Sequence, residues 1–392
     1  MRIIYITGKG GTGKTVISAI TALKSSQYGY NTLIISSDPA HTLKDCFGIE
    51  VGREYTKIAK DLYGLAIDPV KEASEHYGAI MEYIASIFRA RGIDEILAYE
   101  LAALPGMTGV ATMLKLDMII KEDSFDTIII DTVPSGDALR YLYVPTLLSR
   151  MSRRMMKLIS PIVEMGRVMT PITGVPTPTK ESVEKGIEII EKMENIRKYL
   201  LDSNITSLRL VANPDSFSIS NVKRTYIQSS LYGLNTDLII INKLYPKEGV
   251  GEFFKDWLIN QTRLIEDVNK TFHPIPIKML RLYNSELKGI DMLTRAGDDL
   301  FGDEDPTQIY YKGRTVEINR YGDRLEVIYP APHITKKDIE IERIGDELLV
   351  KLSTDMGIVD LVLPLPLITY KMKVEKARLI NGKLHIIFVE EK

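Results

Sequence analysis

The sequence predicts an α/β protein with a mostly parallel sheet and helical insert regions, followed by a small all-β sandwich. Apolar runs of strand length alternate with helical stretches as far as residue 298, which is typical of a parallel sheet covered by helices on both faces. Beyond residue 306 the pattern changes to short strands separated by Gly, Asn, Asp and Pro turns. Because 392 residues exceed what one core usually fills, two domains are expected.

The first domain is expected to span residues 1–298. A helix is predicted at 15–26, directly after a glycine-rich segment, and two helix-rich inserts are predicted at about 70–120 and 138–202. The strands of the expected sheet are the apolar runs 2–7, 31–38, 125–132, 207–213, 237–243 and 272–278.

Residues 299–306 are interpreted as an acidic linker, because five acidic residues fall within 298–305 and Pro306 follows them. This interpretation expects the segment to be solvated. Residues 307–392 are predicted to form a small β-sandwich. Its expected strands are 315–320, 323–330, 338–344, 346–353, 357–364 and 383–390.

The composition excludes several classes of function. Fifty Lys and Arg residues balance 52 Asp and Glu residues, so the net charge gives no reason to expect a nucleic-acid partner. A single cysteine forms neither an internal disulfide nor a multi-thiolate metal site. The N-terminus does not read as a signal peptide, and charges and prolines interrupt the least polar stretch, 155–176. A cytoplasmic protein is expected.

The strongest functional signal is the run GKGGTGKT, which fits the P-loop pattern G-x-x-x-x-G-K-T. It lies between a predicted strand and a predicted helix, which is the context in which this loop binds phosphates. We expect Lys14 to reach the β- and γ-phosphates of ATP and the Thr15 hydroxyl to bind Mg²⁺. The predicted ATP-binding residues of the run are Gly8, Lys9, Gly10, Gly11, Thr12, Gly13, Lys14 and Thr15.

Two further features lie close to this run. Lys9 directly follows the first glycine, and a second lysine at this place marks a deviant P-loop. Asp38, within SSDPAHTLKDCFG, closes the second predicted strand. A carboxylate there is placed to orient or deprotonate an attacking water, although a helix cap or a turn before proline is an equally good interpretation.

Lys9 and the segment around Asp38 resemble the arsenite-pump ATPase (ArsA) family, which also contains targeting factors for tail-anchored membrane proteins. The resemblance implies that Asp38 is the catalytic carboxylate and that Lys9 reaches the nucleotide of a dimer partner. The stretch 130–137, IDTVPSGD, resembles the second switch of this family. This resemblance implies that Asp131 holds Mg²⁺ through water. The structural alternative is that Asp131 caps a helix. Asp137 departs from the family, which usually has histidine there.

The same resemblance extends to later segments. Asn242 matches the asparagine that reads the adenine edge in the family, since an amide both donates and accepts. Asp215 falls where relatives place an acidic nucleotide contact, and residues 285–289 resemble a late family stretch. Asn242 and Asp215 also fit ordinary residues at strand ends.

The family suggests two kinds of function. Arsenite capture requires several thiolates, but Cys46 is the only cysteine, and it is most simply a small buried residue. The paired C-x-x-C with which many targeting factors share zinc between subunits is also missing. A Mg-dependent homodimeric ATPase that binds and releases an apolar client is therefore favoured, with an arsenite- or antimonite-pump ATPase as the alternative.

The client is expected to contact region 147–169, where five methionines are interleaved with leucine, isoleucine and valine. Flexible thioethers suit surfaces that accept varied apolar partners, although a helical core or a dimer contact explains the pattern equally well. Basic residues in the same region allow a transient membrane or receptor contact. Residues 361–364 and 376–384 resemble marks of the α-crystallin domain of small heat-shock proteins, so a holdase with nucleotide-set dimer geometry is a further alternative.

Overall fold

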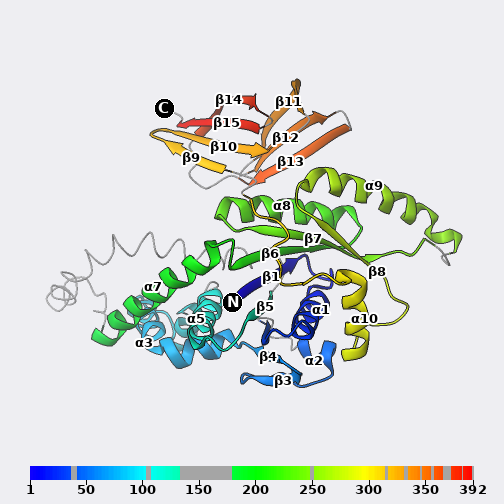
Figure 1. The fold of residues 1–392 in the computed structure, drawn as a ribbon. Helices are drawn as coiled ribbons and strands as arrows, with labels where there is room; N and C mark the ends of the chain where they lie inside the picture. Colours follow the sequence, from blue (N-terminus) through cyan, green and yellow to red (C-terminus); the bar gives the residue numbers. More distant parts are fainter. Residues whose placement is uncertain are drawn as a thin grey trace.

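The centre of the molecule is an eight-stranded sheet with the order β3-β4-β2-β5-β1-β6-β7-β8 (Figure 1). Neighbouring strands are parallel except for β3 and β4, which are antiparallel. The computed structural model describes residues 1–36, 42–102, 107–132, 179–247, 251–313, 317–330, 334–344, 347–354, 357–364, 372–381 and 383–390. The strands are β1 Arg2–Gly8, β2 Thr32–Ser36, β3 Thr56–Ala59, β4 Leu62–Ala66, β5 Thr127–Asp131, β6 Thr206–Ala212, β7 Thr236–Leu244 and β8 Ile277–Arg281.

Helices cover both faces of this sheet. Along β1, Ile3 and Tyr5 join the apolar cluster on one face and Ile4 and Ile6 join the cluster on the other, as the period of two in a strand requires. The first face is covered by α5 Met107–Glu122, α7 Lys180–Leu201, α8 Ser216–Tyr232 and α9 Lys255–Phe272. The second face is covered by α1 Lys14–Gln27, α2 Thr42–Phe47 and α10 Ile290–Phe301.

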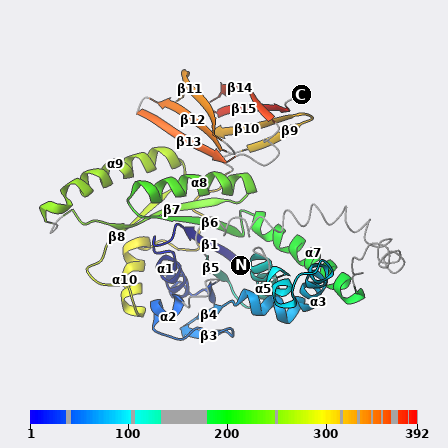
Figure 2. The same cartoon turned by 180° about the vertical axis from the view of Figure 1, so that it is seen from behind.

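The helix-rich insert predicted at 70–120 is present. It contains α3 Pro69–Ala90, α4 Glu95–Ala102 and the greater part of α5, and α3 contacts α5 and α7. Seen from behind, these helices lie together at one end of the molecule, near α7 (Figure 2). No helix among the described residues is long and apolar enough to cross a membrane.

The predicted mostly parallel α/β fold is confirmed, with two differences in detail. The run 272–278 is not a strand from its start, because α9 continues to Phe272 and β8 begins at Ile277. In addition, β3 and β4 are not among the strands that the sequence predicts. Gly64 in β4 weakens the strand pattern, and it lets the side chains of Ile58 and Val51 pack closely, since a Cβ at this position would lie 2.8 Å from Ile58 and 3.0 Å from Val51.

Of the five acidic residues of the segment 298–305, Asp305 is half-buried and the other four are exposed, so their side chains are solvated as expected. Asp298 and Asp299 belong to α10, and the chain that follows lies along the sheet. Arg2 Nε donates to the Thr307 carbonyl at 2.9 Å, and Tyr30 Oη donates to Asp305 at 2.8 Å. These contacts attach the segment 302–313, here called the strap, to the end of the sheet where β1 begins.

A buried ion pair also holds the strap. Arg209 in β6 and Asp237 in β7 are both fully buried, with Nε and Oδ1 3.3 Å apart. The Arg209 guanidinium donates to the Gln308 carbonyl at 3.2 Å and lies 5.2 Å from the centre of the Tyr310 ring. Burial of a charge is costly unless it is paired and hydrogen-bonded, so the strap is part of what makes this pair stable.

The C-terminal part is all-β, as predicted. It consists of an antiparallel four-stranded sheet, β14-β15-β10-β9, and an antiparallel three-stranded sheet, β11-β12-β13 (Figure 1). Both sheets lie beyond α8, which contacts β13. Strand β14 is not among those that the sequence predicts, and the resemblance to an α-crystallin domain stays a prediction. The strands are β9 Glu317–Tyr321, β10 Arg324–Pro330, β11 Ile334–Ile344, β12 Glu347–Thr354, β13 Gly357–Pro364, β14 Met372–Ile380 and β15 Lys383–Glu390.

Candidate nucleotide site

The glycine-rich run forms a tight turn between β1 and α1. A Cβ on Gly8 would lie 2.3 Å from the Val211 carbonyl oxygen of β6, so no larger residue fits between these strands. Gly11 and Gly13 have φ values of +82° and +87°, in the left-handed region that favours glycine. The turn therefore depends on the glycines that the P-loop pattern supplies.

The carbonyl groups of this turn are bound by protein donors. The Lys9 carbonyl accepts from the Thr12 hydroxyl at 2.8 Å and from Lys14 Nζ at 3.4 Å. The Thr12 carbonyl accepts from Asn242 Nδ2 at 2.9 Å. Meanwhile the first N–H groups of α1 have no partner within their own helix, as at the start of any helix. This arrangement fits an anion bound at the start of α1.

Asn242 and Lys243, at the end of β7, both contact the loop. Asn242 is 4% exposed, and its Oδ1 accepts from the backbone N–H of Lys243 at 2.9 Å. A Cβ on Gly13 would lie 2.4 Å from Asn242 Nδ2, so Gly13 also permits this close approach. Lys243 Nζ donates to the Gly11 carbonyl at 2.8 Å. The structure thus brings Asn242 to the P-loop, where it braces the loop, and its contact with the adenine edge stays a prediction.

Thr15 and Asp131 provide the oxygen ligands that Mg²⁺ prefers. Asp131 ends β5, which is paired with β1 beside the P-loop, and it is 1% exposed. Its Oδ1 accepts from the hydroxyl of Ser18, which is one turn of α1 beyond Thr15. Among the described residues no group of three or more His, Cys, Asp and Glu side chains converges. This donor set fits Mg²⁺, which is usually bound by one or two protein groups together with phosphates and water.

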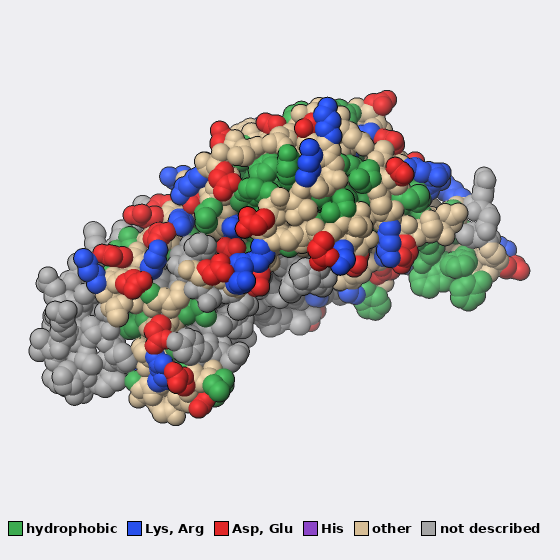
Figure 3. Space-filling view, turned by 90° about the horizontal axis from the view of Figure 1, so that it is seen from below, with side chains coloured by type: hydrophobic (Ala, Val, Ile, Leu, Met, Phe, Trp, Pro, Cys, Tyr) green, Lys and Arg blue, Asp and Glu red, His purple; other side chains and the backbone are tan. Residues whose placement is uncertain are grey.

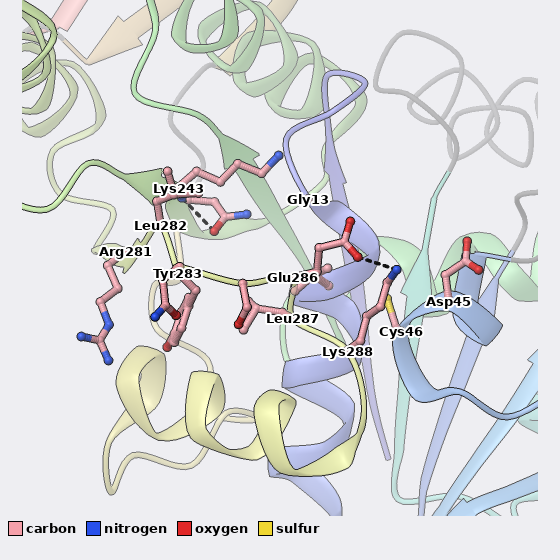
Figure 4. Close-up of a pocket in the computed structure, with 14 residues that line it drawn as sticks. Gly13, Asp45, Cys46, Lys243, Arg281, Leu282, Tyr283, Glu286, Leu287 and Lys288 are labelled. Carbon is pink, nitrogen blue, oxygen red and sulfur yellow. Dashed lines mark hydrogen bonds and ion pairs between the residues drawn. The ribbon is translucent and has the colours of Figure 1, made fainter. Parts of the chain in front are cut away.

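Two adjoining pockets open at this edge of the sheet. The smaller one, of about 350 Å³, lies at the P-loop and is lined by Gly10, Gly11, Gly13, Lys14, Thr15, Val16, Thr132 and Lys243. The larger one, of about 580 Å³, is shown in Figure 4. Its lining residues are Gly13, Val16, Asp45, Cys46, Asn242, Lys243, Arg281, Leu282, Tyr283, Asn284, Ser285, Glu286, Leu287 and Lys288. We call them the phosphate pocket and the lateral pocket.

The lateral pocket is lined by Asn242 and by residues 285–288 of the predicted late stretch 285–289. Within it Glu286 and Lys288 form an ion pair at 2.5 Å, which lowers the pKa of Glu286 and raises that of Lys288 (Figure 4). Burial, together with a hydrogen bond to Asp299, raises the pKa of Tyr283 to about 12, so its hydroxyl stays protonated at neutral pH. A flat apolar body with a few polar groups is the kind of ligand that such a pocket accepts.

Sequence reasoning missed Lys243, Arg281 and Tyr283 as pocket residues. The position of Lys243 directly after Asn242 at a strand end was the only available signal. Arg281 and Tyr283 lie at and just beyond the end of β8, whose predicted range stopped at 278 and gave no reason to single them out.

Asp215 caps a helix in this structure. Its Oδ1 accepts from the backbone N–H of Ser218 at 2.8 Å, at the start of α8. It lines neither pocket, so its contact with a nucleotide stays a prediction. Asn213, two residues earlier, lies nearer to the loop, with Nδ2 3.5 Å from the Gly11 carbonyl oxygen.

The deviant lysine, Lys9, is exposed and does not line either pocket. Its Nζ lies 5.4 Å from the centre of the Phe217 ring, a cation–π contact at the start of α8. Phe217 itself is 77% exposed. Lys9 therefore points to the surface rather than into the phosphate pocket of its own chain.

Cys46 lines the lateral pocket but is only 5% exposed. Burial, with a smaller effect from the charge of Asp131, raises the pKa of its thiol to about 12. The thiol is thus protonated at neutral pH, and the expectation of a small buried cysteine fits this environment. Asp38, Asp137 and the region 147–169 lie outside the described residues.

Known proteins resemble this chain over most of its length. The family model of anion-transporting ATPases matches residues 1–302. A provisionally named arsenical pump-driving ATPase of Chlorobaculum tepidum is 31% identical over 365 residues, 92% of this chain and 90% of that protein. An uncharacterised protein of Streptomyces coelicolor is 27% identical over 398 residues, 100% of this chain and 98% of that protein. ATPase get3 of Sclerotinia sclerotiorum is 27% identical over 311 residues, 76% of this chain and 89% of that protein.

Proposed function

Because this chain belongs to the anion-transporting (ArsA) ATPase family, whose members hydrolyse ATP, we propose that it is a Mg²⁺-dependent homodimer that binds and releases an apolar client. In this proposal ATP closes the dimer around the client, which is a tail-anchored or other membrane-protein segment, and hydrolysis opens it again. The predicted cytoplasmic location is part of the same proposal.

The observation that supports the nucleotide site best is the junction of the two pockets. The phosphate pocket and the lateral pocket share Gly13, Val16 and Lys243. A ligand with a phosphate chain at one end and a planar base at the other fits two such adjoining spaces. Asn242, predicted to read the adenine edge, lines the lateral pocket, and its Nδ2 has a second N–H besides the one bound to Thr12.

Each residue of the site has a defined task in hydrolysis. Lys14 and the first N–H groups of α1 bind phosphate oxygens and stabilise the charge that develops on them. Thr15 would hold Mg²⁺ directly and Asp131 would hold it through water, and the ion would neutralise charge on the phosphate chain. Asp38 orients the attacking water and accepts its proton.

Steady-state hydrolysis of ATP by three variants tests this assignment. Lys14→Ala and Asp38→Asn should each lower kcat by about 10²–10⁴-fold, because each removes a group that acts in the transition state. Asp256→Asn, an exposed residue of α9, is the matched control and should keep its activity. Full activity of Asp38→Asn would show that another group positions the water.

The proposed homodimer uses Lys9 in trans. Its outward orientation at Phe217 supports this, because a residue that serves a partner must reach the surface. An apolar surface is also available around the start of α9. Phe253, just before this helix, is 82% exposed and Trp257, in its first turn, is 47% exposed, and Figure 3 shows hydrophobic side chains gathered at one end of the molecule. An exposed group of this kind is a candidate for contact with a partner.

Sedimentation of the Asp38→Asn protein with ATP tests the dimer. We expect dimers with ATP, and fewer dimers when Lys9→Ala is added, whereas Lys60→Ala, another exposed lysine, should have no effect. Hydrolysis and dimerisation that are both unchanged by Lys9→Ala would contradict the trans role.

Client binding is tested with a fluorescent peptide. A segment of about 20 apolar residues, long enough to span a bilayer, should bind more tightly in the presence of ATP than of ADP. The same segment interrupted by two lysines is the control. Equal affinity for both peptides, or the same affinity in ATP and in ADP, would count against an apolar client.

The arsenite-pump alternative draws support from the name of the Chlorobaculum tepidum relative. The buried, protonated thiol of Cys46, which is the only cysteine of the chain, opposes it. A hydrolysis rate that rises on addition of arsenite or antimonite would favour this alternative. A holdase is the second alternative, and it predicts that removal of 307–392 abolishes protection of a client while hydrolysis continues.

A further inference from the structure

Lys243 has a backbone conformation that is unusual for a lysine. Its φ is +59°, in the left-handed region. The other non-glycine residues with positive φ in the described part of the chain are Asp61, Asp123 and Asn381. Asp and Asn tolerate this region because their short polar side chains bond locally, whereas lysine has no such compensation. Strain of this kind persists where the surroundings enforce it, often at a functional site.

The surroundings that enforce it are those of the nucleotide site. The backbone N–H of Lys243 is held by Asn242 Oδ1 at 2.9 Å. From there the side chain extends toward the P-loop (Figure 4), where Nζ donates to the Gly11 carbonyl at 2.8 Å. An ammonium group has three donors, and this bond uses one of them. The left-handed backbone at Lys243 thus directs its ammonium group toward the P-loop.

Lys243 lines both pockets, at the place where they meet. Of the other two lysines at the loop, Lys14 lines the phosphate pocket alone and Lys9 lines neither, lying instead against Phe217. The second cation that this chain supplies to its own phosphate pocket is therefore Lys243.

We propose that Lys243 is a nucleotide-binding residue whose ammonium contacts the α- and β-phosphate oxygens of the bound nucleotide. These phosphates lie between the base and the γ-phosphate, so they occupy the junction of the two pockets. The contact is then made equally with ATP and ADP, and it contributes to affinity rather than to the chemical step. This inference rests on the proposed ATP site.

Calorimetric binding of ATP, ADP and adenosine tests the proposal. Loss of one charge-assisted hydrogen bond predicts that Lys243→Met weakens ATP and ADP alike, by about 10- to 100-fold, and leaves adenosine binding unchanged. Lys243→Arg keeps the charge and should stay within a few-fold of the natural protein. The control, Lys247→Met, changes an exposed lysine just beyond β7 that lines neither pocket.

Kinetics and folding supply the remaining readouts. Lys243→Met should raise KM by the factor lost in affinity while kcat changes by less than about threefold. Lys243→Asn, which tolerates positive φ, should show the same loss of affinity without a lower melting temperature. These two variants separate lost phosphate contact from a misfolded loop.

Two results would overturn the proposal. If Lys243→Met binds ADP as tightly as the natural protein, the ammonium does not contact the phosphates. If the affinity for adenosine falls by the same factor as the affinity for ADP, the residue acts through the shape of the pocket. Failure of the natural protein to bind ATP or ADP at all would instead contradict the proposed nucleotide site. The two failures are thereby distinguishable.

Discussion

The side-chain amide of Asn242 joins the end of β7 to the P-loop, and its removal should loosen that loop. Thr12 is 1% exposed, so its carbonyl would lose a partner at 2.9 Å that water does not readily replace, at a cost of about 1–3 kcal/mol. The second bond, from the backbone N–H of Lys243 to Oδ1, is less buried and contributes about 0.5–1.5 kcal/mol. Asn242→Ala should therefore lower the free energy of unfolding by about 1.5–4.5 kcal/mol.

The chain offers a local probe for this measurement. Trp257, its only tryptophan, lies in α9, so its fluorescence during urea unfolding reports the part of the protein that contains the large sheet. Asn260→Ala, an exposed change in the same helix, is the matched control and should alter stability by about 0.5 kcal/mol or less.

Nucleotide preference then separates two roles of the amide. If Asn242 braces the loop, Asn242→Ala lowers the affinity for ATP and the affinity for GTP by the same factor, because both nucleotides carry the same phosphates. If it only reads adenine, ATP alone binds less tightly and the stability of the protein is unchanged. Unchanged unfolding of Asn242→Ala together with lost discrimination between ATP and GTP would refute the reasoning.

Three further predictions concern other parts of the structure. Asp237→Asn leaves the buried charge of Arg209 without its partner and should lower the free energy of unfolding in urea by about 3–5 kcal/mol. A decrease of less than about 1 kcal/mol would mean that water reaches the pair. The thiol pKa of Cys46, about 12 against an ordinary value of 9.0, keeps the thiolate scarce, so alkylation at pH 8 should be up to about a thousandfold slower in the folded protein than in urea and should speed up as the pH rises. Equal rates in both states would contradict the burial of Cys46. Gly13→Ala forces a left-handed alanine against Asn242 and should reduce ADP affinity and melting temperature together, and normal values of both would show that the loop can rearrange.

Local patterns in the sequence predicted much of this fold. The apolar runs of β1, β5 and β7 are uninterrupted over at least three residues, and Gly11 and Gly13 of the P-loop are favoured by the left-handed backbone there. By contrast, β4 contains a glycine whose reason is the close approach of Val51 and Ile58. Such a contact between separate segments leaves no local pattern from which a strand can be predicted.

The candidate site shows the same limit. Lys14 and Thr15 are identified by their spacing from the loop glycines, because that spacing is local. Asn242 was predicted as an adenine contact through a family resemblance, but its bond to the Thr12 carbonyl depends on how β7 lies beside β1's loop in three dimensions. Lys243 has no sequence pattern of its own, and only its φ and its reach to Gly11 indicate a role.

The strap overlaps the segment that was interpreted as a solvated acidic linker, and it is fastened to the sheet by Arg2, Arg209 and Tyr30. The C-terminal sheets are thus joined to the ATPase through a segment that shares the ATPase's own buried ion pair. A protease that cuts at Pro306 or Thr307, which are buried, requires that end of the sheet to open locally, so the rate of cleavage there reports the local stability of the ATPase. Force applied to the C-terminal sheets would likewise load the start of β1 and the strands β6 and β7, at the end of the sheet opposite to the P-loop.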